Sequence, residues 1–165
     1  MNNLVYLLLG GNQGDVRSIF ATAREQFVLQ LGREVSASAL YQTEPWGFTA
    51  DKPFLNQVVL LETLIAPGSL LEKVLQIEKD LGRLRVEGVQ GYVSRPVDID
   101  ILFYNDDVIS SKELTVPHPR LHQRNFTLFP LNDIAPELLH PVLHKTISEL
   151  KLTCEDTLKV ELLPE

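Results

Sequence analysis

The sequence predicts an α+β fold in which helices pack on an antiparallel sheet. Two observations lead to this prediction. Apolar runs rich in β-branched and aromatic residues, which are typical of strands, alternate with segments whose apolar residues recur at helical spacing. Their order along the chain is strand, helix, strand, strand, helix, strand. With 165 residues, the chain is long enough for one sizeable core but short for two, so we expect a single domain over residues 1–165.

The first strand and the first helix are expected at residues 4–9 and 16–27. Residues 4–9 form a short continuous apolar run, which favours a buried central strand. The glycine-containing residues 10–15 are open to two interpretations. A phosphate-binding loop would need a Lys-Ser or Lys-Thr pair that is absent here, so a tight turn with Asp15 near the helix cap is favoured. We expect Gly32 to stop the helix.

Two more strands and a second helix follow. Residues 34–41 alternate apolar and small polar side chains, and residues 54–63 form a longer, mostly apolar run. Pro67 opens the second helix at a position where proline is tolerated, and Gly82 is expected to end it. Helical spacing predicts a buried stripe that consists of Leu70, Val74, Ile77 and Leu81.

The fourth strand, residues 95–104, carries a pair of carboxylates. Side chains alternate between the two faces of a strand, so one set should point into a core: Val97, Ile99, Ile101 and Phe103. Asp98 and Asp100 then lie side by side on the other face, with their Cα atoms roughly 7 Å apart. Two such carboxylates repel each other and favour a nearby cation, and oxygen ligands on a rigid element suit Mg²⁺. The alternative is an exposed strand face that is merely polar.

The order β-α-β-β-α-β is that of the ferredoxin-like fold, which places both helices on one face of the sheet. The opposite face would carry Asp98 and Asp100. Beyond residue 105 we expect C-terminal additions: a short strand at residues 108–110, a helix or turn at 121–131, a helical turn at 146–150 and one more strand in the tail. These additions would cover part of the open face and form a cleft.

Composition argues against several functional classes. Hydrophobic residues make up 44% and charged residues 22% of the chain, which are ordinary values for a soluble globular protein. The formal net charge of -7 disfavours nucleic-acid binding, which requires a basic surface. The single cysteine, Cys154, permits no disulfide within the chain and indicates a reducing compartment. We find no signal peptide or membrane-spanning run, so we expect a cytoplasmic protein that contacts no membrane.

Positive charge gathers around the Asp98/Asp100 strand. Three arginines precede the carboxylates and a histidine and another arginine follow them: Arg83, Arg85, Arg95, His118 and Arg124. The guanidinium group binds phosphate through paired hydrogen bonds, and arginines together with a metal ion are typical of phosphoryl transfer. The alternative is a set of scattered surface residues. Their clustering around one Asp-x-Asp strand favours a nucleotide site.

Several stretches of the chain resemble one known family. They run in the family's order over residues 4 to about 140, and they are specific in combination. They are Leu9-Gly-Gly-Asn12, Tyr41-Gln-Thr-Glu-Pro-Trp-Gly47, Phe54-Leu-Asn-Gln-Val58, Ile77-Glu78, Gly82-Arg-Leu-Arg85, Arg95-Pro-Val-Asp-Ile-Asp-Ile-Leu102, Leu114-Thr-Val-Pro-His-Pro-Arg120, Arg124, Phe126 and Ile134-Ala-Pro-Glu-Leu138. The chain therefore resembles the 6-hydroxymethyl-7,8-dihydropterin pyrophosphokinases of the folate pathway.

The resemblance implies a Mg²⁺-dependent enzyme that transfers pyrophosphate from ATP to 6-hydroxymethyl-7,8-dihydropterin and releases AMP. Asp98 and Asp100 would bind two Mg²⁺ ions, and Arg83 and Arg95 would act in catalysis. The ATP site would consist of Leu71, Glu78, Arg83, Arg95, Ile101, Thr115, His118 and Arg124. The pterin site would consist of Thr43, Pro45, Trp46, Asn56, Tyr92 and Phe126. We expect a monomer whose partners are these small-molecule substrates.

The chain departs from the family pattern in one loop. The family commonly has Trp-Gly-Pro before the arginine that matches Arg95, whereas here the run is Gly-Tyr-Val-Ser at residues 91–94. Tyr92 is the residue expected to replace the stacking tryptophan. In the family, the loops around Trp46 and between Arg85 and Arg95 close over the substrates, and we expect the same movement here.

Two other functional classes fit parts of the pattern. A metal-dependent nuclease or phosphatase also uses paired carboxylates, but the acidic charge argues against a nuclease. A ligand-binding regulatory domain can share the ferredoxin-like fold, but it leaves the aspartate pair and the arginines unexplained.

Overall fold

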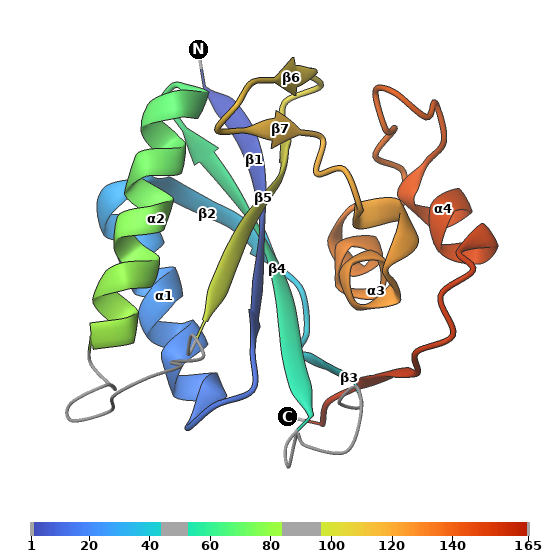
Figure 1. The fold of residues 1–165 in the computed structure, drawn as a ribbon, viewed down its shortest axis with the longest axis horizontal. Coiled ribbons are helices and arrows are strands. Elements are labelled where there is room, and N and C mark those ends of the chain that lie inside the picture. The colour runs from blue at the N-terminus through green and yellow to red at the C-terminus, as the bar shows by residue number, and fades with distance from the viewer. Residues whose placement is uncertain (1, 44–52, 84–96, 165) are drawn as a thin grey trace.

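The computed structural model describes residues 2–43, 53–83 and 97–164, which form a sheet with helices on both faces (Figure 1). The sheet strands are β1 (Asn3–Gly11), β2 (Gly32–Ala37), β3 (Tyr41–Thr43), β4 (Phe54–Thr63), β5 (Asp98–Tyr104) and β8 (Val160–Leu162). A separate pair is formed by β6 (Ile109–Ser110) and β7 (Thr115–Val116). The helices are α1 (Val16–Gln30), α2 (Pro67–Arg83), α3 (Asn125–Ile134) and α4 (Ile147–Thr153), with a 3-10 turn, η1 (Leu121–Gln123).

The sheet has the strand order β5-β1-β4-β3-β8, and β2 also pairs with β4. Its pairings are antiparallel. β1 pairs with β4 along its whole length, from Asn3 opposite Thr63 to Gly11 opposite Leu55, and its other edge pairs with β5. The first strand thus lies between the third and fourth strands of the predicted order. The α+β class and the ferredoxin-like arrangement are confirmed.

The strand predicted at residues 34–41 is two strands. β2 ends at Ala37 and β3 begins at Tyr41, and both pair with β4. Between them, the Ser38 hydroxyl accepts a hydrogen bond from the Val58 backbone N–H at 2.9 Å, and the Ser38 N–H donates to the Val58 carbonyl at 2.8 Å. Because a side-chain oxygen replaces a main-chain acceptor here, the regular ladder is interrupted.

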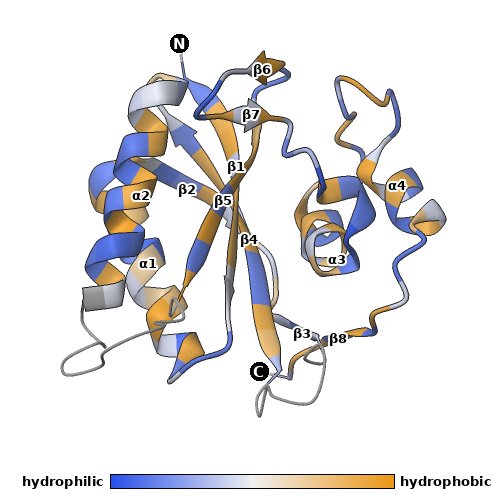
Figure 2. Cartoon of the chain, viewed as in Figure 1, coloured by the Kyte–Doolittle hydropathy of each residue, from blue (hydrophilic) through white to orange (hydrophobic). Residues whose placement is uncertain are grey.

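One face of the sheet is covered by α1 and α2, as predicted. Apolar residues of β1 lie there in one core with Phe20 and Phe27 of α1, which are almost completely buried. The predicted buried stripe of α2 is confirmed, since each of its four residues is at most 4% exposed: Leu70, Val74, Ile77 and Leu81. Figure 2 shows α2 banded with polar and apolar residues, as expected for a helix with one buried face.

The two glycines predicted to stop helices differ in outcome: α1 ends directly before Gly32, with Leu31 as its C-cap, whereas α2 runs past Gly82. α1 ends at Gln30, and Gly32 is the first residue of β2. A Cβ at position 32 would lie only 2.1 Å from the carbonyl oxygen of Glu62, so the close approach of β2 to β4 requires glycine. Gly82 lies inside α2, which continues to Arg83. The helix therefore extends one residue past Gly82 within the described residues, which is compatible with a glycine that weakens a helix by only about 1 kcal/mol.

A second core lies between the opposite face of the sheet and the helices α3 and α4. Phe103 belongs to this core, with its ring centroid 6.0 Å from that of Tyr6, so the prediction that it shares a face with Ile101 is wrong. Tyr6 pairs with Phe103 but Leu7 pairs with Ile101, which leaves Leu102 as an extra residue in β5. Such a bulge reverses the faces to which the following side chains point.

The C-terminal additions cover part of the sheet face that carries Asp98 and Asp100. Helix α4 begins with a capping box made by Thr146 and Glu149. The tail then returns to the sheet as β8 and pairs with β3, which confirms the expected last strand. In the part of the chain that the structure describes, no helix has the length and apolar content needed to cross a membrane.

Candidate active site

A pocket of about 240 Å³ opens between the sheet and the start of α3. The sheet contributes residues from four strands: Leu8 and Gly10 of β1, Thr43 of β3, Phe54 and Asn56 of β4, and Asp98 and Asp100 of β5. The opposite wall is made by Arg124, Phe126 and Leu158. Six of the residues that the sequence singled out therefore meet in one cavity: Thr43, Asn56, Asp98, Asp100, Arg124 and Phe126.

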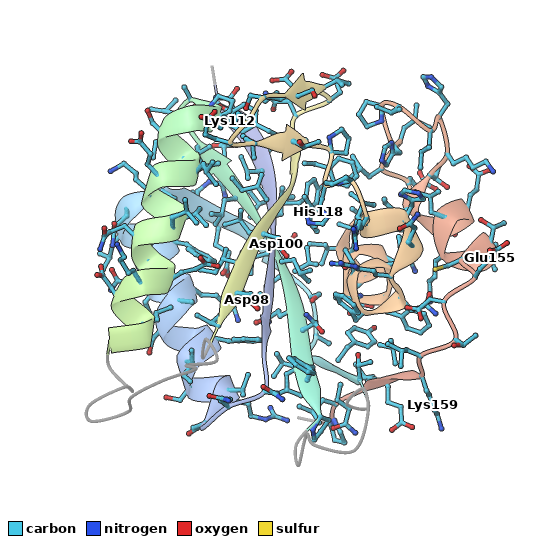
Figure 3. All side chains as sticks on the ribbon, viewed as in Figure 1. Asp98, Asp100, Lys112, His118, Glu155 and Lys159 are labelled. Atoms are coloured by element: carbon cyan, nitrogen blue, oxygen red, sulfur yellow. The ribbon has the colours of Figure 1, made fainter. Side chains whose placement is uncertain are left out.

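The two aspartates lie on the pocket face of β5. In the β1–β5 pairing, Asp98 is opposite Gly10 and Asp100 is opposite Leu8. Asp98 is exposed and Asp100 is half-buried, whereas the intervening Ile99 is buried in the first core. Figure 3 shows both carboxylates on β5, facing the space in front of α3, with His118 nearby. This geometry offers acidic oxygen atoms to a cation without disturbing the core.

Glu78 of α2 supports the aspartate strand from the side. Its Oε2 atom accepts a hydrogen bond of 2.6 Å from the backbone N–H of Ile99, the residue between the two aspartates. A charged acceptor makes this a strong hydrogen bond. Glu78 was predicted as an ATP contact; it does not line the pocket, and it holds β5 against α2.

His118 stands beside the carboxylate pair. Its backbone N–H donates to the Leu102 carbonyl at 2.9 Å, and its Nδ1 atom accepts from the Arg120 N–H at 3.2 Å. Burial lowers the pKa of His118 below its usual value, with Arg124 and Arg120 acting in the same direction and Asp100 opposing them. The lowered pKa favours the neutral imidazole, and because Nδ1 accepts a hydrogen bond, the proton of that neutral form lies on Nε2.

Arg124 and Phe126 lie at the start of α3, and their side chains contact each other. The Arg124 guanidinium lies 5.4 Å from the centroid of the Phe126 ring, a distance suited to a cation–π contact. The far end of α3 is tied to the β3 region by Asp133, which accepts from the Tyr41 hydroxyl at 2.6 Å and from the Ala39 N–H at 3.2 Å. The helix is thus held against the sheet, with Phe126 over the pocket.

The end of the pocket away from the aspartates carries an amide and a hydroxyl. The Asn56 Nδ2 atom donates to the Leu9 carbonyl at 3.2 Å and lies close to Gly10. The Thr43 hydroxyl is buried, and it has no hydrogen-bond partner among the described residues. A buried polar atom without a partner is costly, so Thr43 is suited to bonding a bound molecule.

Several predicted residues do not line this pocket. Leu71 packs beside the first core, Ile101 is buried within it, and Thr115 is exposed on β7. The Ile101 side chain is therefore unavailable to a nucleotide, which leaves only its main chain. Five predicted residues lie outside the described residues: Pro45, Trp46, Arg85, Tyr92 and Arg95. So do the two loops expected to close over the substrates. Arg83 is the last residue of α2, and its side chain is likewise not described.

Sequence reasoning missed four residues of the pocket: Leu8, Gly10, Phe54 and Leu158. Leu8 and Phe54 were assigned to strands, and the alternation of their side chains placed them on a face but not beside a ligand. Leu158 comes from the C-terminal tail, and no signal in the sequence connected it to the aspartate strand.

The chain is similar to known proteins in sequence. Residues 6–136 match the family described as 7,8-dihydro-6-hydroxymethylpterin-pyrophosphokinase. A protein of Porphyromonas gingivalis named 2-amino-4-hydroxy-6-hydroxymethyldihydropteridine pyrophosphokinase is 43% identical over 139 residues, which cover 84% of this chain and 94% of the relative. The protein of the same name from Aquifex aeolicus is 41% identical over 155 residues, covering 94% and 93% of the two chains.

The fold is also similar to that of solved proteins. The crystal structure of Plasmodium falciparum HPPK-DHPS wild type matches 92% of this chain with a TM-score of 0.74 and 19% sequence identity. This chain spans 44% of that longer chain.

Proposed function

Because the chain belongs to the 7,8-dihydro-6-hydroxymethylpterin-pyrophosphokinase family, we propose a role in that reaction for each part of the pocket. The chain transfers pyrophosphate from ATP to 6-hydroxymethyl-7,8-dihydropterin in folate biosynthesis, which yields the pterin diphosphate and AMP. The observation that carries the assignment of roles is the pocket itself, which joins a carboxylate pair to an end lined by Asn56 and Phe126.

Asp98 and Asp100 are the proposed ligands of two Mg²⁺ ions. In support, they are carboxylates on one rigid strand, and Mg²⁺ commonly takes one or two protein carboxylates together with substrate phosphates and water. Among the described residues no group of three or more His, Cys, Asp or Glu side chains forms a metal site. When bound, the ions would neutralise charge on the phosphate oxygens.

The other end of the pocket is the proposed pterin subsite. Phe126 supplies an aromatic face on which a flat heterocycle can stack. Asn56 and Thr43 supply an amide and a hydroxyl, which can bond the polar edge of the pterin ring. Pro45, Trp46 and Tyr92 remain proposed members of this subsite, and they lie outside the described residues.

Arg124 and His118 are the proposed triphosphate contacts within the described residues. Arg124 can donate paired hydrogen bonds to a phosphate, and the neutral His118 can donate through Nε2. Arg83 and Arg95 remain proposed catalytic residues, and the rest of the ATP site is proposed to comprise Leu71, Glu78, Ile101 and Thr115. In the reaction, the pterin hydroxyl oxygen loses its proton and bonds to the β-phosphorus. The bond from that phosphorus to the α,β-bridging oxygen breaks, and AMP leaves with this oxygen.

The chain is further proposed to act as a single-domain monomer in the cytoplasm, with small molecules as its partners. The single cysteine and the formal net charge of -7 support a reducing compartment and argue against a nucleic-acid partner. Size-exclusion chromatography with light scattering would test the oligomeric state.

The experiment that tests the proposed function is an assay of AMP release. Purified protein is incubated with ATP and Mg²⁺, with and without 6-hydroxymethyl-7,8-dihydropterin, and the metal requirement is measured by adding a chelator. AMP should form only when both Mg²⁺ and the pterin are present. Equal AMP formation without the pterin would contradict the assignment, and turnover that persists with chelator would contradict the metal proposal.

A further inference from the structure

We infer that the C-terminal segment at residues 156–158 is part of the pterin subsite, in which Leu158 forms an apolar wall and Asp156 is a positioning residue for Phe126. This inference rests on the proposed function, because it takes the pterin to occupy the Phe126 end of the pocket. The segment lies outside residues 6–136, which match the family, so the family resemblance assigns it no role.

The tail reaches the pocket by a fixed path. After α4 it runs along the start of α3 and joins the sheet as β8, in which Val160 pairs with Thr43 of the pocket (Figure 1). Beyond β8, the Leu163 N–H donates to the Leu40 carbonyl at 2.8 Å, and the Arg17 guanidinium donates to the Pro164 carbonyl at 2.6 Å. These contacts hold the segment between α3 and β3.

Asp156 joins this tail to the first residue of α3. One carboxylate oxygen of Asp156 accepts from the Asn125 backbone N–H at 2.9 Å, and the other accepts from the Leu158 N–H at 3.0 Å. The Asn125 side-chain amide donates in return to the Asp156 carbonyl at 3.1 Å. One carboxylate therefore fixes both Leu158 and the residue directly before Phe126.

α3 depends on this distant carboxylate because it lacks a local cap. Arg124 occupies the N-cap position, makes no side-chain capping hydrogen bond, and no acidic residue lies in the first turn. The exposed N–H groups of a helix start favour a nearby negative charge, and Asp156 supplies one from 31 residues away. The orientation of Phe126, on the first turn of α3, is thereby coupled to the tail.

Leu158 completes the apolar side of the cavity. It is half-buried and lines the same pocket as Phe126 and Phe54. A flat heterocycle stacked on Phe126 would have Leu158 as a further apolar neighbour. Leu158 should therefore contribute to the affinity for the pterin. It should not contribute to the affinity for the triphosphate, because the proposed triphosphate site is at the aspartate end of the pocket.

Calorimetry with tail variants tests the inference. The pterin is titrated into enzyme that holds Mg²⁺ and a non-hydrolysable ATP analogue, and the analogue is titrated separately. Leu158→Ala should weaken pterin binding about tenfold and change analogue binding less than about twofold. Leu158→Met, which conserves volume, should restore most of the affinity. Leu152→Ala is the matched control, because that leucine is 84% exposed on α4.

Asp156 is tested through a double-mutant cycle. Asp156→Ala should weaken pterin binding about tenfold, whereas Asp156→Asn, which keeps an acceptor oxygen, should weaken it less. Because Asp156 acts through Phe126, its substitution should have a much smaller effect in the Phe126→Ala background than in the wild type. Glu155→Ala, a neighbouring exposed carboxylate on the same tail, is the control. Thermal unfolding of every variant separates loss of fold from loss of affinity.

The outcomes separate failure of the inference from failure of the proposed function. If Phe126→Ala weakens pterin binding but folded Leu158→Ala and Asp156→Ala do not, the tail inference is overturned and the pterin subsite stands. Full additivity of Asp156→Ala and Phe126→Ala overturns the positioning role. If folded Phe126→Ala itself binds the pterin normally, the proposed subsite is wrong, and the tail inference fails with it.

Discussion

Substitution of Gly10 by alanine tests the contact between β1 and the pocket side chain of Asn56. A Cβ at position 10 would lie 2.8 Å from the Asn56 Nδ2 atom, which is too close for two non-bonded atoms. Asn56 is only 5% exposed, and its Nδ2 donates to the Leu9 carbonyl at 3.2 Å. Because the amide must move away from the added Cβ, Gly10→Ala should break this hydrogen bond and turn the Asn56 amide toward the pocket.

The expected magnitude follows from two opposing effects. A buried group left without its hydrogen-bond partner costs about 1–3 kcal/mol. Replacing a glycine whose backbone accepts alanine stabilises a protein by about 0.4–1 kcal/mol, because the unfolded chain becomes less flexible. Gly10→Ala should therefore lower the free energy of unfolding by about 1–2 kcal/mol. If Asn56 also bonds the pterin, pterin affinity should fall by about 2–10-fold, the equivalent of one hydrogen bond.

Urea unfolding measures the loss of stability, and calorimetry measures the loss of pterin affinity. Gly68→Ala is the matched control, because a Cβ at position 68 meets no atom within 4 Å. Gly68 lies in α2, where alanine is the better helix former, so this variant should gain up to about 1 kcal/mol and bind the pterin normally. If Gly10→Ala matched the wild type in both stability and pterin affinity, the reasoning about Asn56 would be refuted.

Three further predictions concern the carboxylates, the stacking residue and a buried histidine. Asp100→Asn should lower the rate of AMP release by about 10²–10³-fold, as loss of a charge-stabilising group does. Its thermal unfolding temperature should stay near that of the wild type, because Asp100 faces the pocket. A folded variant with normal turnover would exclude the metal role. Phe126→Ala should weaken the free energy of pterin binding by about 1–3 kcal/mol and that of ATP binding by much less. Equal losses for the two ligands in calorimetry would contradict the stacking assignment. Burial, together with His122 and His144, lowers the pKa of His140 below 6.5, and its Nδ1 accepts from the N–H groups of residues 142 and 143. The His140 imidazole of the unfolded chain takes up a proton near pH 6.5, whereas that of the folded chain does so only at lower pH. The free energy of unfolding should therefore fall as the pH drops below about 6.5, by at most about 1.4 kcal/mol per pH unit. His140→Asn should flatten this dependence in urea unfolding at pH 7.5 and 5.5, and an unchanged dependence would show that His140 is not its source.

The sequence by itself determined the order of the elements and the residues that could do chemistry. Periodicity placed the first strand, the strand Phe54–Thr63 and the buried stripe of α2 within a few residues of their positions in the structure. These features are local, because a strand or helix with one buried face must repeat its apolar residues at a fixed spacing. The alternation that set Asp98 and Asp100 apart from Ile99 is local in the same way.

Only the tertiary structure decided how distant segments meet. The extra residue Leu102 moved Phe103 to the second core, because a bulge depends on the register of two strands and leaves no periodic signal in either. The cap of α3 by Asp156 spans 31 residues of chain, so neither segment indicates it alone. The pocket has the same origin: one chain segment supplies the carboxylates, another supplies Phe126, and the C-terminal tail supplies Leu158, and only their packing against one sheet brings the three together.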